Sequence, residues 1–333
     1  MTTTRYDILG LGNAIVDVIA RTDDDFLAAH ELNKGAMTLI DEHRAEALYA
    51  AMGPAQIISG GCAANTASGV ASLGGRAAFI GKVKADTLGE LFAQNIHAFG
   101  VGFKTKAAKR GPATARSFIL VTPDGERTMN TYLGACQGLR PSDIDADTVA
   151  ASAYVYLEGY LWDPPLAKDA FRKAAKIAHG AGRRVALTLS DPFCVDRFRD
   201  EFMDLLTSKT VDILFANQHE LKSLFQTADL GTAVGALRDT GAFGVVTRGP
   251  DGAMTVTREE TKSAPAFPVE RVVDTTGAGD LFAAGFLFGL ARDYSELECL
   301  RLGALAAAEV IQHLGARPEC SLKDLAMQEG LAA

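Results

Sequence analysis

Asp274-Thr-Thr-Gly-Ala-Gly-Asp280-Leu-Phe-Ala-Ala-Gly-Phe-Leu287 is the most informative stretch of the 333-residue chain. A loop of small residues leads into an apolar run that predicts a buried helix. Gly277 and Gly279 let backbone N–H groups approach a ligand, and the partial positive charge of a helix N-terminus favours an anion. Asp280, which that same charge favours as a carboxylate, is placed to accept a proton from a hydroxyl attacking a phosphoryl group. A simple helix cap is the alternative interpretation of Asp280.

Outside this stretch, strand-like and helix-like runs alternate, which predicts an α/β fold with three α/β/α layers around a mostly parallel sheet. The last third is expected to be mostly helical. Residues 13–40 and 112–135 break the alternation with strand-rich sequence, and Pro123-Asp124-Gly125 marks a hairpin. We therefore expect a β-rich lid of residues 13–42 and 112–136. Residues 1–12, 43–111 and 137–333 would form the large nucleotide- and substrate-binding domain.

Composition excludes several classes of protein. Lys and Arg number 33 against 41 Asp and Glu, so a net charge of −8 gives no reason to expect nucleic acid or an anionic membrane as partner. The five scattered cysteines form no CxxC pair, which argues against a disulfide framework or a zinc site. The first seven residues contain no apolar signal region, and the apolar run at 281–291 is too short to span a bilayer. We expect a cytoplasmic monomer or homodimer that acts on a small molecule.

The 274–287 stretch resembles the C-terminal signature of the ribokinase-like (PfkB) family of carbohydrate and nucleoside kinases. Residues 59–74 resemble the family's N-terminal signature, Asn217-Gln-His-Glu220 its Asn-x-x-Glu motif, and Thr247-Arg-Gly-Pro-Asp-Gly252 its nucleotide loop. The resemblance implies an α/β/α core with a β-sheet lid, ATP and Mg²⁺ as cofactors, and an anion hole at Gly277-Ala278-Gly279. It also allows a monovalent cation near Asp274.

The acceptor side of the site is expected near two segments. Gly60 and Gly61 allow a ligand hydroxyl to approach the backbone, and Asn65, one turn into the next helix, donates and accepts toward a diol. Close packing of this helix on the sheet is the alternative. The Asp17 carboxylate has two acceptor oxygens that match a ribose 2′,3′-diol, unless it is a solvated edge-strand residue. The resemblance places Asn13 near the nucleoside.

The nucleotide side is expected around two further motifs. Asn217 and Glu220 are three residues apart and so share a helix face, unless they only cap the helix. Asn217 would then face phosphate, and Glu220 would orient water around Mg²⁺, which needs few protein ligands. Thr247, Gly249 and Gly252 would shape the loop around the nucleotide.

The remaining candidates lie in the lid, at the sheet edge and before the helix. Arg127 would reach the transferred phosphate when the lid closes, in competition with Arg116. Asn130 on the return strand would touch substrate, and Phe193 would stack on a nucleobase. An exposed hairpin arginine and a core phenylalanine are the alternatives. Thr276, beside the anion hole, is assigned to the nucleotide.

Three segments favour a nucleoside as acceptor. The opening Gly-x-Gly-Asn-x-x-x-Asp at 10–17, the segment 187–193 and the lid run 126–130 resemble the bacterial adenosine-kinase-like branch. We expect transfer of the γ-phosphoryl group to the 5′-hydroxyl of a ribonucleoside, first of all adenosine. An inosine-guanosine kinase and a sugar kinase of ribokinase or fructokinase type remain alternatives. Intact Asp280 disfavours a non-catalytic regulator, Ile15 replaces the third glycine of a dinucleotide fingerprint, and no Walker A run occurs.

Overall fold

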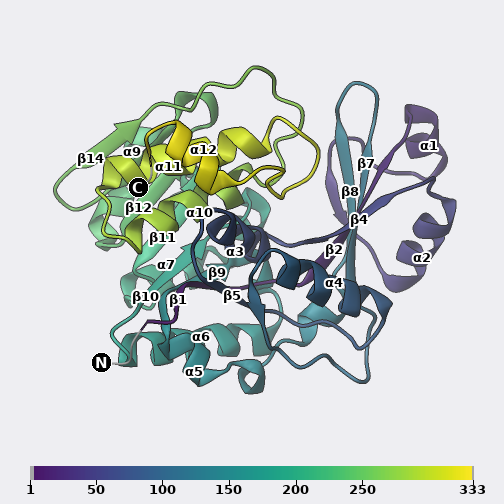
Figure 1. The fold of residues 1–333 in the computed structure, drawn as a ribbon, viewed down its shortest axis with the longest axis horizontal. Helices are drawn as coiled ribbons and strands as arrows, with labels where there is room; N and C mark the ends of the chain where they lie inside the picture. The colour runs from purple at the N-terminus through teal and green to yellow at the C-terminus, as the bar shows by residue number, and fades with distance from the viewer. Residues whose placement is uncertain (1–3, 332–333) are drawn as a thin grey trace.

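A computed structural model describes residues 4–331 and contains two sheets that lie side by side (Figure 1). The larger sheet has nine strands in the order β14-β13-β12-β11-β10-β9-β1-β5-β6, and the smaller has five in the order β3-β8-β7-β2-β4. Within the described residues, no helix is both long and apolar enough to cross a membrane.

The strands of the large sheet, in chain order, are β1 (Tyr6–Leu11), β5 (Ala77–Ile80), β6 (Gly102–Phe103), β9 (Ser152–Glu158), β10 (Arg184–Thr188), β11 (Ile213–Asn217), β12 (Phe243–Thr247), β13 (Ala253–Val256) and β14 (Thr261–Ala264). The strands of the small sheet are β2 (Ile15–Arg21), β3 (Met37–Leu39), β4 (Gln56–Gly60), β7 (Ala115–Val121) and β8 (Arg127–Tyr132).

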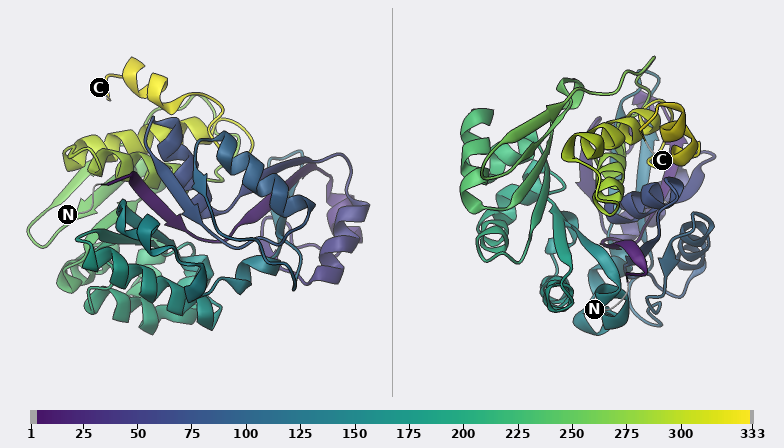
Figure 2. Two further views of the ribbon diagram at one scale, coloured as in Figure 1. Left: turned by 60° about the horizontal axis from the view of Figure 1, so that its bottom comes forward. Right: turned by 60° about the vertical axis from the view of Figure 1, so that its left-hand side comes forward.

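Helices cover both faces of the large sheet, as the two views of Figure 2 show. One face carries α3 (Cys62–Ser72), α4 (Thr87–Ala98), α10 (Ala278–Leu290), α11 (Glu296–Val310) and α12 (Leu322–Gln328). The other carries α5 (Ala146–Ala150), α6 (Pro165–Gly180), α7 (Pro192–Thr207), α8 (Gln218–Leu224) and α9 (Leu230–Thr240). The expected three-layer α/β/α fold with a mostly parallel sheet is therefore confirmed.

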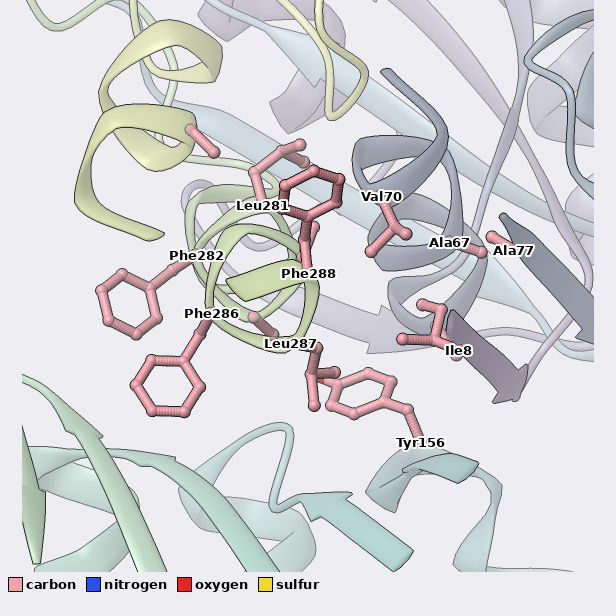
Figure 3. Close-up of a cluster of buried hydrophobic side chains, with 14 of the residues drawn as sticks. Ile8, Ala67, Val70, Ala77, Tyr156, Leu281, Phe282, Phe286, Leu287 and Phe288 are labelled. Carbon is pink, nitrogen blue, oxygen red and sulfur yellow. The ribbon is translucent and has the colours of Figure 1, made fainter. Parts of the chain in front are cut away.

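The α10 helix is the central element of the first helical layer. Its sequence is apolar on all sides, and it packs between α3, α11 and the sheet, which is how such a helix avoids water. Figure 3 shows Leu281 and Phe288 of α10 beside Val70 of α3. A Cβ on Gly285 would lie only 2.5 Å from the Leu302 carbonyl oxygen, so α10 and α11 approach with their backbones in contact. This tight packing fixes the N-terminal end of α10, where Asp280 lies.

The chain between β12 and α10 contains two strands, although the last third was expected to be mostly helical. β13 and β14 form an antiparallel hairpin that extends the edge of the sheet beyond β12. Their runs are only four residues long, too short for a periodic pattern to separate strand from loop.

The small sheet includes a segment that the sequence analysis assigned to the large domain. β4 pairs with β2, and α1 (Asp24–Ala29) and α2 (Glu42–Ala51) pack their apolar residues on one face of the same sheet. Residues 43–60, within the expected 43–111 segment, therefore lie with the small sheet. The exact limits of a moving lid stay a prediction.

Candidate active site

A cavity of about 690 Å³ lies between the small sheet and the carboxyl ends of the central strands. This is where ligands bind in open α/β sheets. Most residues expected in the site line it, namely Asn13, Asp17, Gly61, Asn65, Phe193, Asn217, Glu220, Thr247, Gly249, Thr276, Gly277, Ala278, Gly279 and Asp280.

The anion loop, Gly277-Ala278-Gly279, begins with a glycine whose backbone is in the left-handed region of φ/ψ space. Gly277 caps α10 with φ of 77°, and a Cβ there would lie 2.7 Å from the Cβ of Ala316. Only glycine meets both demands without strain. The amides of Gly279 and Asp280, in the first turn, have no helical carbonyl to donate to, so they are available to an anion in the cavity.

Asp280 is fixed by contacts with α3. Asn65 Nδ2 donates to Asp280 Oδ2 at 2.8 Å, and Thr66 Oγ1 donates to the Asp280 carbonyl oxygen at 3.1 Å. The surrounding protein raises the pKa of Asp280, while hydrogen bonds from Asn65 and Cys62 and the charge of Arg317 lower it. The helix N-terminus was expected to keep this carboxyl ionised. Burial acts in the opposite direction and makes it more basic, which suits a proton acceptor.

Asp17 reaches the cavity from β2 and is 7 % exposed. Within residues 4–331 no donor makes a hydrogen bond to its carboxylate. Burial raises the pKa of Asp17 to about 7, while Arg317 and Arg127 act to lower it. A Cβ on Gly60 would lie 2.1 Å from Asp17 Oδ2. Gly60, expected to touch substrate, does not line the cavity and instead makes room for Asp17.

Gly61, next along the chain, adopts φ of 94°, and a Cβ there would lie 2.1 Å from the Asn13 carbonyl oxygen. A side chain at position 61 would therefore clash with the backbone of residue 13. Gly61 lines the cavity, and the expected approach of a ligand hydroxyl to its backbone stays a prediction.

Glu158, at the end of β9, also lines the cavity, and sequence reasoning missed it. Its carboxylate accepts hydrogen bonds from Asn13 Nδ2 at 3.1 Å and from the Ala63 amide at 3.0 Å. Burial raises the pKa of Glu158 to about 7. A Cβ on Gly12 would lie 2.2 Å from Glu158 Oε2, which explains a glycine there. An acidic residue at the end of an otherwise apolar strand was the available signal.

Asn217 and Glu220 begin α8 and make the reciprocal cap that was the alternative to a ligand role. The Asn217 amide and Nδ2 donate to the Glu220 carboxylate at 2.9 and 2.6 Å, and the Asn217 side chain accepts from the Glu220 amide. Both nevertheless line the cavity. Burial raises the pKa of Glu220 to about 7, opposed by the Asn217 amide and reinforced by Asp191 and Asp280.

Several acidic side chains line the cavity, among them Asp17, Glu158, Glu220 and Asp280. Among residues 4–331 no group of three or more His, Cys, Asp or Glu side chains is arranged to hold a metal. Mg²⁺ in phosphoryl-transfer sites is typically held by phosphates, water and one or two carboxylates. Glu220 lines the cavity, and its role toward such an ion stays a prediction.

Two of the three residues expected in the nucleotide loop line the cavity, and the third shapes the loop. Thr247 and Gly249 line the cavity, whereas Gly252 does not. Gly252 has φ of 81°, and its carbonyl accepts from the Arg248 amide at 2.7 Å. A Cβ there would lie 2.1 Å from the Ala264 carbonyl oxygen, so this glycine closes the loop against β14.

The lid hairpin places two expected residues away from the cavity. Asn130 is 2 % exposed and lies on the face of the small sheet that packs against α2, together with its cross-strand partner Phe118. Its neighbours Met129 and Thr131 line the cavity instead, because successive side chains of a strand point to opposite faces. The expectation that Asn130 touches substrate is wrong in this structure.

Arg127 is also outside the cavity lining. Its Nη1 lies 2.7 Å from Asp274 Oδ1, which joins the small sheet to the loop before α10. Asp274 further accepts hydrogen bonds from the amides of Thr276 and Gly315. Arg116, its competitor, has its guanidinium 5.6 Å from the Tyr132 ring centre, on the same face as Asn130.

Phe193 stands at the rim of the cavity, 62 % exposed, with the Arg197 guanidinium 5.3 Å from its ring centre. It is therefore not a core residue, and its ring is accessible for stacking.

Residues 45–323, which include all of these loops, match the family model described as pfkB family carbohydrate kinase. The chain belongs to the pfkB family. This membership confirms the resemblance and the expectation of an ATP-dependent phosphotransferase that acts on a hydroxyl group.

Several pfkB relatives match the chain over nearly its whole length. The structure of adenosine kinase from Sinorhizobium meliloti is 55 % identical, with a TM-score of 0.93, and the match covers 98 % of this chain and 100 % of that one. That of a "probable sugar kinase protein" from Rhizobium etli CFN 42 is 52 % identical, with a TM-score of 0.94, over 99 % and 100 % of the chains. Adenosine kinase from Saccharomyces cerevisiae is 28 % identical over 92 % of this chain and 94 % of its own.

Proposed function

We propose that this kinase transfers the γ-phosphoryl group of ATP to the 5′-hydroxyl of a ribonucleoside, with adenosine as the preferred acceptor. The observation that carries the proposal is that Asp17, Asn65, Asp280 and the Gly277–Gly279 loop all line one and the same cavity. Similarity to the adenosine kinase from Sinorhizobium meliloti supports the choice of adenosine.

Asp280 acts as the general base in this proposal. Little of a ribose hydroxyl is ionised at neutral pH, so a positioned carboxylate that accepts its proton assists attack on phosphorus. Asn65 holds one carboxylate oxygen, which orients the base. The first-turn amides of α10 and the end of the helix receive the negative charge of the transferring phosphoryl group.

Asp17 selects the sugar. Its carboxylate lies in a polar row across the small sheet, beside Ser117 and Thr131, whose hydroxyls are 2.9 Å apart. Two vicinal hydroxyls supply the donors that this buried carboxylate lacks. With the ribose held in this way, the nucleobase lies toward the apolar side chains of the lid and the accessible ring of Phe193.

ATP occupies the other end of the cavity, beside Asn217, Thr247, Gly249 and Thr276. Mg²⁺ bound to its phosphates reduces the negative charge that the acceptor oxygen must approach. Glu220 is the residue that holds water toward this ion. A monovalent cation near Asp274, a cytoplasmic location and a monomeric or homodimeric state stay predictions.

A sugar kinase is the second candidate, favoured by one observation. The buried Glu158 carboxylate lies at the acceptor end of the cavity and offers acceptor oxygens for a further hydroxyl. The name of the Rhizobium etli relative points the same way.

A substrate panel tests the proposal. Purified enzyme with ATP and Mg²⁺ is assayed for ADP formation with adenosine, inosine, guanosine, ribose and fructose. We expect the highest kcat/KM with adenosine and a 5′-monophosphate as product. Phosphorylation of ribose or fructose without any nucleoside would refute the proposal, and a preference for inosine or guanosine would correct the base assignment.

A further inference from the structure

The loop between α11 and α12 places a buried arginine behind the site. Arg317 is 6 % exposed, yet within residues 4–331 its guanidinium has no carboxylate as a direct partner. Nε donates to the Ser59 carbonyl oxygen at 3.1 Å, Nη1 to the Ala64 carbonyl oxygen at 2.6 Å and to Ser68 Oγ, and Nη2 to Ser59 Oγ at 3.2 Å. The planar fork thus holds three points of one segment.

That segment, residues 59–68, carries the acceptor-binding groups. It contains the end of β4, the Gly60–Gly61 turn and the first turns of α3 with Asn65. The rigid guanidinium donates hydrogen bonds to backbone and side-chain oxygens in several directions. These bonds fix the position of segment 59–68 relative to the loop that carries Arg317.

The two residues before Arg317 contact the segment that leads into α10. The Gly315 amide donates to Asp274 Oδ2 at 2.8 Å, and a Cβ on Gly277 would lie 2.8 Å from the Cα of Ala316. Residues 315–317 therefore touch the loop before α10 on one side and the segment 59–68 on the other. The Asn65–Asp280 hydrogen bond spans the same gap inside the cavity.

We propose that Arg317 is a positioning residue of the kinase, which sets the separation between segment 59–68 and Asp280 and supplies a fixed positive charge behind them. The inference rests on the proposed function, since it assumes that Asp280 and the acceptor hydroxyl must meet. Arg317 does not line the cavity, so it acts through other residues and not on the substrate.

The charge of Arg317 opposes the effect of burial on both acids of the acceptor site. Burial lowers the pKa of Arg317 to about 10, which leaves it protonated at neutral pH. Its charge in turn lowers the pKa of Asp280 and of Asp17. Loss of this charge would raise both values, so a larger fraction of each acid would be protonated at a given pH.

Other groups facing these acids contribute to the same titration. The charged or titratable groups that interact with Asp280 or Asp17 are Cys62, Arg127, Tyr156, Glu158, Glu220 and Asp274. Burial raises the pKa of the Cys62 thiol and the Tyr156 phenol well above their usual values, so both stay neutral. The fall of activity at acid pH therefore reflects several acids together. The informative quantity is the difference between variants in the pH at which activity falls.

The experiment compares Arg317→Gln and Arg317→Lys with the wild type, using the acceptor that the wild type phosphorylates best. Arg317→Gln removes charge and fork, and we expect kcat to fall about 30-fold or more, since small displacements at a reacting centre are costly. The acid limb of kcat/KM should move up by about one pH unit, with KM for ATP within about threefold. Arg317→Lys keeps the charge, so the limb should stay in place while kcat falls about tenfold.

Arg292→Gln is the matched control, because Arg292 pairs with Asp7 beyond the far end of α10 and is outside the cavity lining. Its kcat and acid limb should equal those of the wild type. Retention of wild-type kcat and acid limb in either Arg317 variant would overturn the proposal. If Arg317→Gln does not fold, a fall in kcat of Arg317→Lys at unchanged melting temperature supports it, and unchanged kcat overturns it. Failure of the proposed function can be distinguished from failure of this inference, because in that case the wild-type enzyme would phosphorylate no nucleoside.

Discussion

Asn65 Nδ2 lies 2.8 Å from Asp280 Oδ2, although the two residues are 215 positions apart in the chain. The contact joins the first helix after β4 to the first turn of α10. One oxygen of the proposed base is thereby fixed, so its orientation is set before any substrate enters. Such preorganisation is where enzymes gain much of their rate.

Replacement of the base tests its assignment directly. Asp280→Asn keeps the size of the side chain and removes the proton acceptor, so we expect kcat to fall by roughly 10²–10⁴-fold. Nucleoside binding, measured by calorimetry, should stay within about tenfold, because the amide still hydrogen-bonds the hydroxyl. A variant with more than about a tenth of wild-type kcat, with chemistry rate-limiting, would falsify the assignment.

The diol assignment of Asp17 predicts a dependence on the 2′-hydroxyl. Asp17→Asn should weaken binding of adenosine by about 1–3 kcal/mol, the scale of hydrogen bonds to a charged group. Binding of 2′-deoxyadenosine, which already lacks one donor, should change little. Equal losses for the two nucleosides in the same titrations would show that Asp17 does not hold the diol.

Nucleoside affinity should also depend on pH through Asp17. Its pKa in the free enzyme is raised to about 7, so the carboxyl is increasingly protonated as the pH falls below that value. Protonation removes an acceptor, and adenosine affinity should fall toward acid pH. Dissociation constants measured from pH 5.5 to 8.5 should show this slope in the wild type and a smaller one in Asp17→Asn. Identical slopes would contradict the prediction.

Glu158 should make the unliganded enzyme less stable as the pH rises. Its pKa is about 7 in the folded protein against an ordinary value of 4.5, so the folded state binds the proton more tightly than the unfolded state. The free energy of unfolding therefore falls between about pH 4.5 and 7, on the order of 3 kcal/mol for this group. Urea titrations of Glu158→Gln at pH 5 and pH 8 should show a smaller difference than the wild type, and an unchanged difference would refute it.

Two glycines of the anion loop should respond differently to alanine. Gly277→Ala places a Cβ against Ala316 at φ of 77°, so both melting temperature and activity should fall. Gly279→Ala meets no atom within 4 Å and lies in a helix, so its melting temperature should stay or rise. Its KM for ATP should nevertheless increase, because the methyl group enters the anion site. Equal melting temperatures for both variants would contradict this reading of the loop.

Local sequence predicted the elements whose pattern is long and regular. The apolar run of α10, the small-residue helix α3 and the Asp-Gly hairpin between β7 and β8 were all identified. Asn130 was misplaced because a strand pattern does not tell which face meets a cavity until the pairing register is known. Arg317 was missed because a single arginine in a loop has no periodic signal, and its partners are more than 240 positions away.

The parallel pairing of β2 with β7 has a consequence for folding. Ile15 pairs with Ala115, so formation of the β2–β7 pairing must close a loop of about one hundred residues. During synthesis β2 can pair with β4 first, but its other edge stays unpaired until β7 emerges, and an unpaired strand edge favours association with other chains. Non-local pairing of this kind also slows folding. We expect the small sheet to assemble after β7 and β8 emerge, and the cavity to be completed only when α10 and the loop carrying Arg317 follow.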